Sequence, residues 1–254
     1  MSVEQYAAID FDVSHILGVR VACLSREATL NRVMGWTGAG QDRSIFYVNA
    51  HCMNLAQQDL EYREILAGAD LVYADGISIV WAGRMLGGCQ LEKMTGADWI
   101  GDYCALAEES AIRTYILAGE PGVAQAAAAK LIGRYPRMQI AGAADGFFIE
   151  KDEREVLSEV NSSRAEVLLV GMGVPLQEKW IARHRERIDA RVCWGVGALF
   201  DYVAGVEPRT PRWMYSAGLE WLWRLMVDPA KKWRRYLLGN PAFVLRVLQE
   251  RFRR

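Results

Sequence analysis

Residues 166–179 read EVLLVGMGVPLQEK, and this stretch decides the fold class. Its short apolar run, Glu166–Val170, predicts a strand. Gly171 and Gly173 then mark a turn, and a helical pattern follows over Leu176–Arg187. A strand, a tight turn and a helix form the repeating unit of a parallel sheet that is covered by helices.

The same alternation continues on both sides of this unit. Further strands are predicted at Ile16–Val21, Ser44–Val48, Asp70–Tyr73, Thr114–Ala118, Met138–Gly142 and Arg191–Val196. Helices are predicted between them at Arg26–Trp36, His51–Ala67, Ile77–Leu86, Ala97–Glu108, Val123–Tyr135 and Asp152–Ser162. The predicted class is therefore α/β, with a parallel sheet and helices on both faces. Ligands of such sheets bind beyond the carboxyl ends of the strands, so the loops there hold the candidate residues.

The composition excludes several classes of protein. Apolar residues make up 52% and charged residues 24% of the 254, as in an ordinary globular protein. No apolar stretch approaches the roughly 20 residues of a spanning helix, and the first fifteen residues show no signal-peptide pattern. The five cysteines contain no CxxC pair, so we expect no metal site and reduced, mostly buried thiols of a cytoplasmic protein.

The character of the chain changes near residue 207. Residues 207–254 hold 11 Lys or Arg against 4 Asp or Glu, whereas residues 1–206 hold 19 against 27. Prolines divide the later segment into helical pieces at Ser216–Val227, Ala230–Leu238 and Ala242–Phe252. We therefore predict an α/β domain over residues 1–206 and a helical, basic and aromatic C-terminal appendage over residues 207–254.

Basic and aromatic residues interleave in this appendage, as in segments that lie on an anionic membrane surface. Nucleic acid is the competing partner for such a pattern, and a solvated face or a contact within a homo-oligomer are structural alternatives. The density of tryptophan favours the membrane over nucleic acid. The basic residues concerned are Arg212, Arg224, Lys231, Lys232, Arg234 and Arg235.

Asp75 is the first candidate catalytic residue, because it follows an apolar strand directly and precedes Gly76. A carboxylate there would point into the ligand cleft, where a general base takes a proton from an attacking hydroxyl. The alternative is a turn or a helix cap, because Asp-Gly is a common turn pair. The local pattern alone favours the alternative.

The loop after residue 170 is a candidate phosphate site. Gly171 and Gly173 allow close approach to the backbone, the following helix N-terminus favours an anion, and Gln177 offers an amide. A tight strand-to-helix turn is the structural alternative. The third glycine of a dinucleotide fingerprint is missing, which counts against NAD and against a nucleotide-dependent oxidoreductase.

Three further strand-end positions are candidates for ligand binding. Gly195, Gly197 and Asp201 could hold a nucleoside, and close helix–sheet packing with an exposed Asp is an equally good interpretation. Lys93 could neutralise a phosphate, while capping of the next helix is the favoured role of Thr95 and Asp98. Asn49 or His51 could contact a ligand after the second strand.

These blocks, taken in order, resemble the WecG/TagA/CpsF family of bacterial glycosyltransferases. The matching segments are NAH at 49–51, ADLVYADG at 69–76, TGAD at 95–98, GMGVPLQEKW at 171–180, GVGALFD at 195–201, GLEWLWRL at 218–225 and WRRYL at 233–237. Each block is weak alone, but five in order together with the tail form a specific pattern. The likeness extends from about residue 15 to 250.

The resemblance implies a Rossmann-like fold and an inverting transfer of one sugar from a UDP-sugar to a sugar on undecaprenyl diphosphate. It implies no cofactor and no metal, and N-acetylmannosamine, its uronic acid or glucose as the donor hexose. The products would enter cell-envelope polymers, including exopolysaccharide. Residues 1–206 would bind the nucleotide-sugar, and residues 207–254 would dock on the inner, cytoplasmic face of the cell membrane as a peripheral anchor.

The resemblance also implies individual roles. Asp75 is the implied base, and Asn49 and Gln177 are implied donor contacts. The appendage would bring arginines to the diphosphate, namely Arg212, Arg224 and either Arg234 or Arg235. A non-catalytic membrane-associated scaffold is the remaining alternative, and the polar residues in the strand-end loops argue against it.

Two positions depart from the family pattern. Tyr47 stands where many members have threonine, and it adds bulk beside a sugar site. Lys93 stands where many have arginine, and lysine keeps the charge but loses the bidentate fork. Both leave the identity of the donor open.

Overall fold

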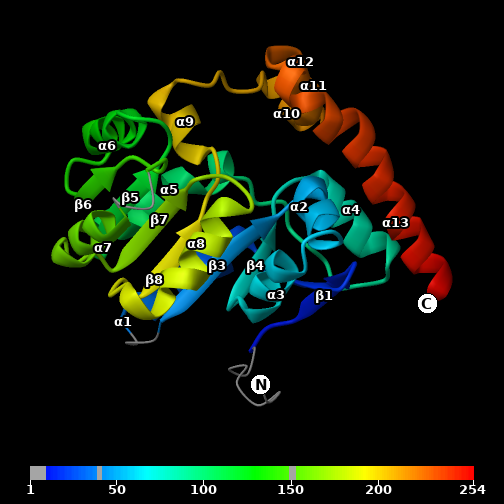
Figure 1. Cartoon of the computed structure of the whole chain (residues 1–254), viewed down its shortest axis with the longest axis horizontal. Helices are drawn as coiled ribbons and strands as arrows, with labels where there is room; N and C mark the ends of the chain where they lie inside the picture. Colours follow the sequence, from blue (N-terminus) through cyan, green and yellow to red (C-terminus); the bar gives the residue numbers. More distant parts are fainter. Residues whose placement is uncertain (1–9, 39–41, 149–152) are drawn as a thin grey trace.

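The computed structural model describes residues 10–38, 42–148 and 153–254 (Figure 1). Within these residues, six parallel strands form one sheet in the order β4-β3-β8-β7-β5-β6. The α/β class predicted from the sequence is confirmed. The strands are β3 (Arg43–Val48), β4 (Leu71–Ala74), β5 (Arg113–Ala118), β6 (Gln139–Ala144), β7 (Val167–Gly171) and β8 (Val192–Gly195).

Helices cover both faces of the sheet, and each face has its own apolar core. Successive residues of β7 serve the two cores alternately, since Leu168 and Val170 pack in one and Val167 and Leu169 in the other. One core includes side chains of α1 (Arg26–Gly38), α5 (Gly96–Glu109), α6 (Val123–Arg134) and α9 (Leu199–Ala204). The other includes side chains of α2 (Ala50–Ala56), α3 (Leu60–Gly68), α4 (Ile77–Met85), α7 (Glu153–Ser162) and α8 (Leu176–His184), after which a 3-10 turn, η3 (Arg185–Arg187), follows.

The first predicted strand, Ile16–Val21, is wrong. The chain instead forms an antiparallel hairpin of β1 (Val13–Ile16) and β2 (Val19–Ala22), separate from the main sheet. Leu17 and Gly18 form its two-residue turn with φ of 49° and 81°. Two successive positive φ values match the twist of a tight hairpin, and Gly18 makes one of them cheap.

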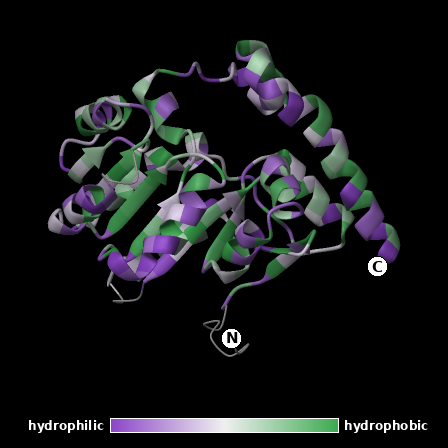
Figure 2. Ribbon diagram, viewed as in Figure 1, coloured by the Kyte–Doolittle hydropathy of each residue, from purple (hydrophilic) through white to green (hydrophobic). Residues whose placement is uncertain are grey.

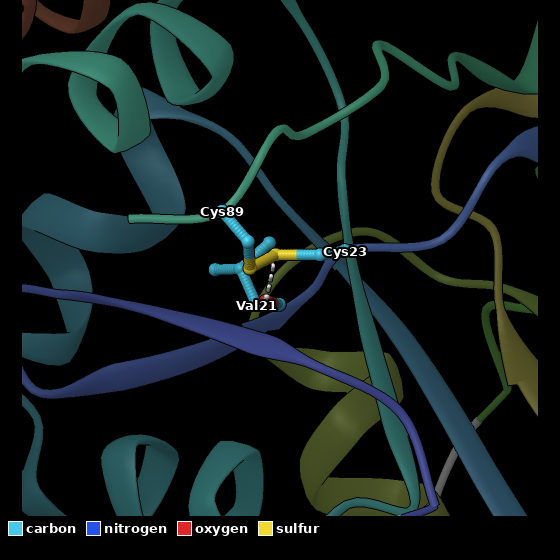
Figure 3. The surroundings of a disulfide bond; sticks show 3 residues. All are labelled: Val21, Cys23 and Cys89. Atoms are coloured by element: carbon cyan, nitrogen blue, oxygen red, sulfur yellow. Dashed lines mark hydrogen bonds between the residues drawn. A yellow bond between two sulfur atoms is a disulfide. The ribbon is translucent and has the colours of Figure 1, made fainter. Parts of the chain in front are cut away.

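The prediction that all cysteines are reduced is also wrong. Cys23, just after β2, forms a disulfide with Cys89, just after α4 (Figure 3), with the two Cα atoms 6.1 Å apart. The bond joins the hairpin to the segment that leads to α5. Cys52, Cys104 and Cys193 are buried free thiols, as expected.

The appendage contains α10 (Arg212–Ser216), α11 (Glu220–Val227), α12 (Pro229–Trp233), a π-helical turn η4 (Arg234–Leu238) and α13 (Gly239–Arg253). The break predicted near Pro241 does not occur, since the chain stays helical from Pro229 to Arg253. The Gly239 N–H reaches back to the carbonyl of Arg234 in the wider π turn. Such a turn accommodates Pro241, whose ring and missing N–H would disturb a regular α-helix.

The appendage crosses from α9 over one end of the sheet and returns along α2 and α4 (Figure 1). Phe243 and Val247 of α13 are fully buried there and belong to one of the two cores. In the described part of the chain, no helix combines the length and apolar character that crossing a bilayer requires.

Candidate active site

A cavity of about 650 Å³ lies at the carboxyl ends of β3, β4 and β8, where the sheet faces the appendage. This is where ligands bind in open α/β sheets. Its lining comes from the strand ends, from the start of α5 and from the chain around α9 to α11. The lining residues are Tyr47, Tyr73, Asp75, Thr95, Gly96, Ala97, Asp98, Val196, Ala198, Leu199, Tyr202, Arg209, Thr210, Pro211, Arg212, Tyr215, Ser216, Glu220 and Arg224.

Asp75 lies in this cavity because it is the first residue after β4. Its backbone N–H donates to the carbonyl of Val48 at 2.8 Å, which extends the β3–β4 pairing by one residue. Gly76, with φ of 111°, occupies the N-cap position of α4, so Asp75 is not the cap of that helix. Burial raises the pKa of Asp75 above its ordinary value, and Arg224 and a hydrogen bond from Asn49 limit the rise.

Asn49 orients this carboxylate through a hydrogen bond. It is the N-cap of α2, and its Oδ1 accepts from the backbone N–H groups of His51 and Cys52 at 3.0 and 3.2 Å. This fixes the amide so that Nδ2 donates to Oδ2 of Asp75 at 3.1 Å. Asn49 does not line the cavity and therefore acts on it through Asp75.

Residues at and just before the start of α5 contact the appendage. Thr95 donates its N–H and its hydroxyl to Oδ2 of Asp98 at 2.9 and 2.8 Å, so the capping predicted for this pair is present. The hydroxyl of Tyr215 in α10 donates to Oδ1 of the same Asp98. The ammonium group of Lys93 lies 3.4 Å from the centroid of the Tyr215 ring, outside the cavity lining.

The six basic residues of the appendage that were named from the sequence divide into two groups. Arg212 and Arg224 line the cavity. Arg224 donates to Glu220 and lies 5.3 Å from the ring centroid of Tyr202. Burial alone would lower the pKa of Arg224, but the negative charge of Glu220 and its other neighbours raise it above the ordinary value. The guanidinium of Arg224 is therefore charged, and its electrostatic influence reaches Asp75.

The second group lies outside the cavity lining. Lys232 pairs with Glu207 at 3.2 Å, and Lys231 is exposed to solvent. Arg234 stacks on Trp233 with its Cζ 5.3 Å from the ring centroid. Arg235 has a buried Nε, and its charge opposes part of the pKa rise of Asp75.

The sequence profile of the Glycosyl transferase WecG/TagA/CpsF family matches residues 14–254. The chain belongs to this family. It is therefore a glycosyltransferase, and the resemblance drawn from the sequence blocks is confirmed.

Two curated members of the WecG/TagA/CpsF family illustrate the relationship. Each is an N-acetylglucosaminyldiphosphoundecaprenol N-acetyl-beta-D-mannosaminyltransferase. The protein of Bacillus subtilis (strain 168) is 29% identical over 203 residues, covering 80% of this chain and 78% of the relative. The protein of Bacillus spizizenii (strain ATCC 23059 / NRRL B-14472 / W23) is 30% identical over 194 residues, covering 76% and 74%.

In this WecG/TagA/CpsF member, Gln177, which was expected to contact the donor, does not line the cavity. Gln177 is fully buried, and its Oε1 accepts from the N–H of Gly197 at 2.8 Å. Its Nε2 donates to Oε1 of Glu178 at 2.8 Å. Both ends of the amide are thus engaged inside the protein. Glu178, the next residue in the first turn of α8, is also completely buried.

The four predicted glycines do not line the cavity, and they shape this region through close packing or through a positive φ. A Cβ on Gly171 would lie 2.7 Å from the carbonyl oxygen of Gly197, and one on Gly195 would lie 2.9 Å from Nε2 of Gln177. Gly197 has φ of 59°, and the hydroxyl of Tyr47 occupies the place of its missing side chain. Gly173 has φ of 78° in the turn before α8.

Asp201 also lies outside the cavity lining, in α9, although its neighbour Tyr202 belongs to that lining. Burial and the nearby charge of Glu207 raise the pKa of Asp201 above its ordinary value. The structure adds Arg209 and Tyr73 to the cavity lining, and neither was predicted from the sequence as a site residue. The missed signal was the Pro208–Pro211 segment, which carries Arg209 between two prolines.

The appendage exposes apolar side chains as well as charge. Figure 2 shows hydrophobic and hydrophilic residues side by side along α11 to α13. The exposed large apolar residues of the appendage are Trp213, Trp221, Met226, Val227, Trp233, Leu237, Leu238, Val244, Leu245 and Phe252. Phe252 is the most open of them, with 86% of its surface exposed.

Proposed function

We propose that this glycosyltransferase moves an N-acetylmannosamine-type hexose from a UDP-sugar to a sugar carried on undecaprenyl diphosphate. The activity named for both Bacillus relatives supports the acceptor class and favours N-acetylmannosamine over its uronic acid or glucose. The UDP carrier follows from the family resemblance. The product would enter a cell-envelope polysaccharide.

The observation that carries this proposal is the carboxylate of Asp75 in the cavity, held by Asn49 and faced by Arg224. In the proposed reaction, Asp75 takes the proton of an acceptor hydroxyl as that oxygen attacks the anomeric carbon. The bond from the anomeric carbon to the UDP oxygen breaks at the same time, and the configuration inverts. A buried carboxylate with a raised pKa is a stronger base than one in water.

We further propose that protein cations, with no resident metal, stabilise the leaving diphosphate. Arg209, Arg212 and Arg224 all line the cavity, and guanidinium groups match phosphate oxygens in charge and geometry. Lys93 lies behind Tyr215 and would act only after that ring moves. EDTA should leave the initial rate unchanged, and restoration of a lost rate by Mg²⁺ or Mn²⁺ would contradict this part of the proposal.

The appendage supplies the proposed attachment to the inner face of the membrane. The exposed Trp233 stacks with Arg234 and lies two residues after Lys231 in the chain, and this combination suits an anionic bilayer surface. A lipid-linked acceptor would then reach the cavity from the side where the appendage covers it.

The test is UDP release from a panel of UDP-sugars, with and without a short-chain N-acetylglucosaminyl-diphospho-lipid. Acceptor-dependent release from one donor is the expected result, and the responding donor names the sugar. UDP-N-acetylmannosamine, its uronic acid and UDP-glucose are all included in the panel. Absence of release from every donor, together with no thermal shift on adding UDP, would overturn the proposal.

A further inference from the structure

Gln177 and Glu178 form a buried polar pair at the start of α8, and neither side chain is exposed to solvent. Gln177 joins two loops that are close only in the folded chain, because its Oε1 accepts from Gly197, twenty residues away. The opposite end of the same amide donates to Glu178. A side-chain amide with both ends engaged has one orientation, so it holds its partners in fixed positions.

The loop that Gln177 holds is part of the cavity wall. Val196 and Ala198 line the cavity on either side of Gly197, and Tyr47 lies against Gly197. The absent side chain of Gly195 leaves the space that the Gln177 amide fills. We propose that Gln177, held by Glu178, is a positioning residue that fixes the Val196–Ala198 segment and Tyr47 beside the catalytic carboxylate.

Glu178 gives this arrangement a dependence on pH. Burial raises the pKa of Glu178 to about 8, and the hydrogen bond from Gln177 opposes only part of the rise. The titratable groups that face it are Tyr47 on β3, Cys52 on α2 and Tyr62 on α3, all of them uncharged acids at neutral pH. The Oε2 atom of Glu178 has no hydrogen-bond partner within the described residues.

Ionisation of Glu178 would therefore leave an unpaired negative charge in the interior, which the protein can relieve only by admitting water. The first turn of α8 would then loosen, and Gln177 would release Gly197. The inference rests on the proposed function for its kinetic readout, but not for its structural one.

The structural readout is hydrogen exchange at the Gly197 amide. Gln177→Met keeps most of the side-chain volume and removes both hydrogen-bonding groups. We expect exchange at Gly197 to become at least about tenfold faster, because the donor loses its only protein partner among the described contacts. Unchanged protection in a folded Gln177→Met protein would overturn the proposed contact.

The kinetic readout uses the same variant and a matched rescue. We expect Gln177→Met to lower kcat/KM for the UDP-sugar by about 10- to 100-fold, since small displacements at a reacting site have effects of this size. The double variant Q177E/E178Q reverses the amide–carboxyl pair and keeps both hydrogen bonds. It should recover most of the loss, which a purely volumetric role for residue 177 would not predict.

Glu178→Gln supplies the pH test, because it is isosteric and cannot ionise. The wild-type kcat/KM should fall as the pH rises through about 8, and the variant should lose this alkaline limb. Identical pH profiles of the wild type and of Glu178→Gln would overturn the positioning role. Fast exchange at Gly197 in Gln177→Met, combined with wild-type kinetics of that variant, would overturn it as well. A wild-type protein without any transfer would remove the proposed function, while the Gly197 exchange would still decide whether the contact exists.

Discussion

Asp75 stands in an Asp-Gly pair, a sequence that by itself predicts a turn or a cap. In the structure Gly76 takes the cap position, and the carboxylate is left to face the cavity. Gly76 therefore provides the backbone geometry of the turn, and the Asp75 side chain remains available to the cavity. The strand end decides this division, since the Asp75 N–H is still paired with β3.

Replacement of Asp75 by Asn tests the base directly. Asp75→Asn keeps the size and the contact with Asn49 but cannot take a proton at neutral pH. We expect kcat to fall by about 10²- to 10⁴-fold, the usual contribution of a general base. UDP affinity, measured by calorimetry, should change little. Near-full transfer to the lipid-linked acceptor by this variant would show that another group is the base.

Asn49 has two roles that different substitutions separate. Asn49→Ala removes both the cap of α2 and the donor to Asp75, whereas Asn49→Ser keeps a capping oxygen and removes only that donor. The alanine variant should lose about 1 kcal/mol of stability in denaturant unfolding, and the serine variant much less.

Both variants should move the acid limb of the pH–rate profile to higher pH. The hydrogen bond from Asn49 lowers the pKa of Asp75, so its loss raises that pKa, and the charged base is then present only at higher pH. An acid limb that stays in place in both variants would mean that this hydrogen bond does not tune the base.

At the scale of elements, several helices of the appendage contact the α/β domain, α10 and α13 among them. Tyr215 of α10 donates to Asp98 at the start of α5, and Phe243 and Val247 of α13 are buried in a core of the domain. Removal of residues 207–254 would therefore expose core residues, and a truncated chain is a poor test of membrane binding. Substitutions of solvent-exposed residues of the appendage avoid this difficulty.

Membrane attachment is best tested with exposed residues of the appendage. Trp213→Ser combined with Phe252→Ser removes two apolar groups that are 67% and 86% exposed. We expect weaker flotation with anionic vesicles, because apolar burial and basic charge act together at such surfaces. Lys231→Gln and Arg234→Gln should weaken binding further, by about 1 kcal/mol for each positive charge removed.

The matched control is Ile132→Ser, an exposed apolar residue of α6 in the α/β domain. It should float like the wild type. Equal flotation of the control, the wild type and the appendage variants would place the membrane contact elsewhere or remove it.

At the scale of the whole molecule, the Cys23–Cys89 disulfide links the hairpin to the segment before α5 across a sequence separation of 66. A covalent link over such a loop limits the freedom of the unfolded chain. Cys23→Ser with Cys89→Ser should therefore lower the free energy of unfolding by about 2–4 kcal/mol under non-reducing conditions.

Dithiothreitol should shift the urea midpoint of the wild type and leave that of the double variant unchanged. Thiol titration of the denatured protein, purified without reductant, should find the three thiols of Cys52, Cys104 and Cys193. Five reactive thiols in that titration would show that the bond does not form.

The sequence alone was sufficient for the six strands of the main sheet and for the position of Asp75 at a strand end. Strand and helix patterns are local, because each depends on the apolar spacing of a few consecutive residues, as in Glu166–Val170. The carboxyl end of a parallel strand is a ligand-binding position whatever the rest of the chain does, and Asp75 occupies one.

Tertiary structure alone decided which polar side chains face the cavity. Gln177 and Asp75 both follow strand ends, yet Gln177 is enclosed by Gly197 and Glu178, whereas Asp75 lines the cavity. The return of the appendage to Asp98, the disulfide and the continuous helix through Pro241 likewise depend on contacts between distant segments. A local sequence pattern does not predict such contacts, because they join residues that are far apart in the chain. They form only on folding, when neighbouring segments determine how deeply each group is buried.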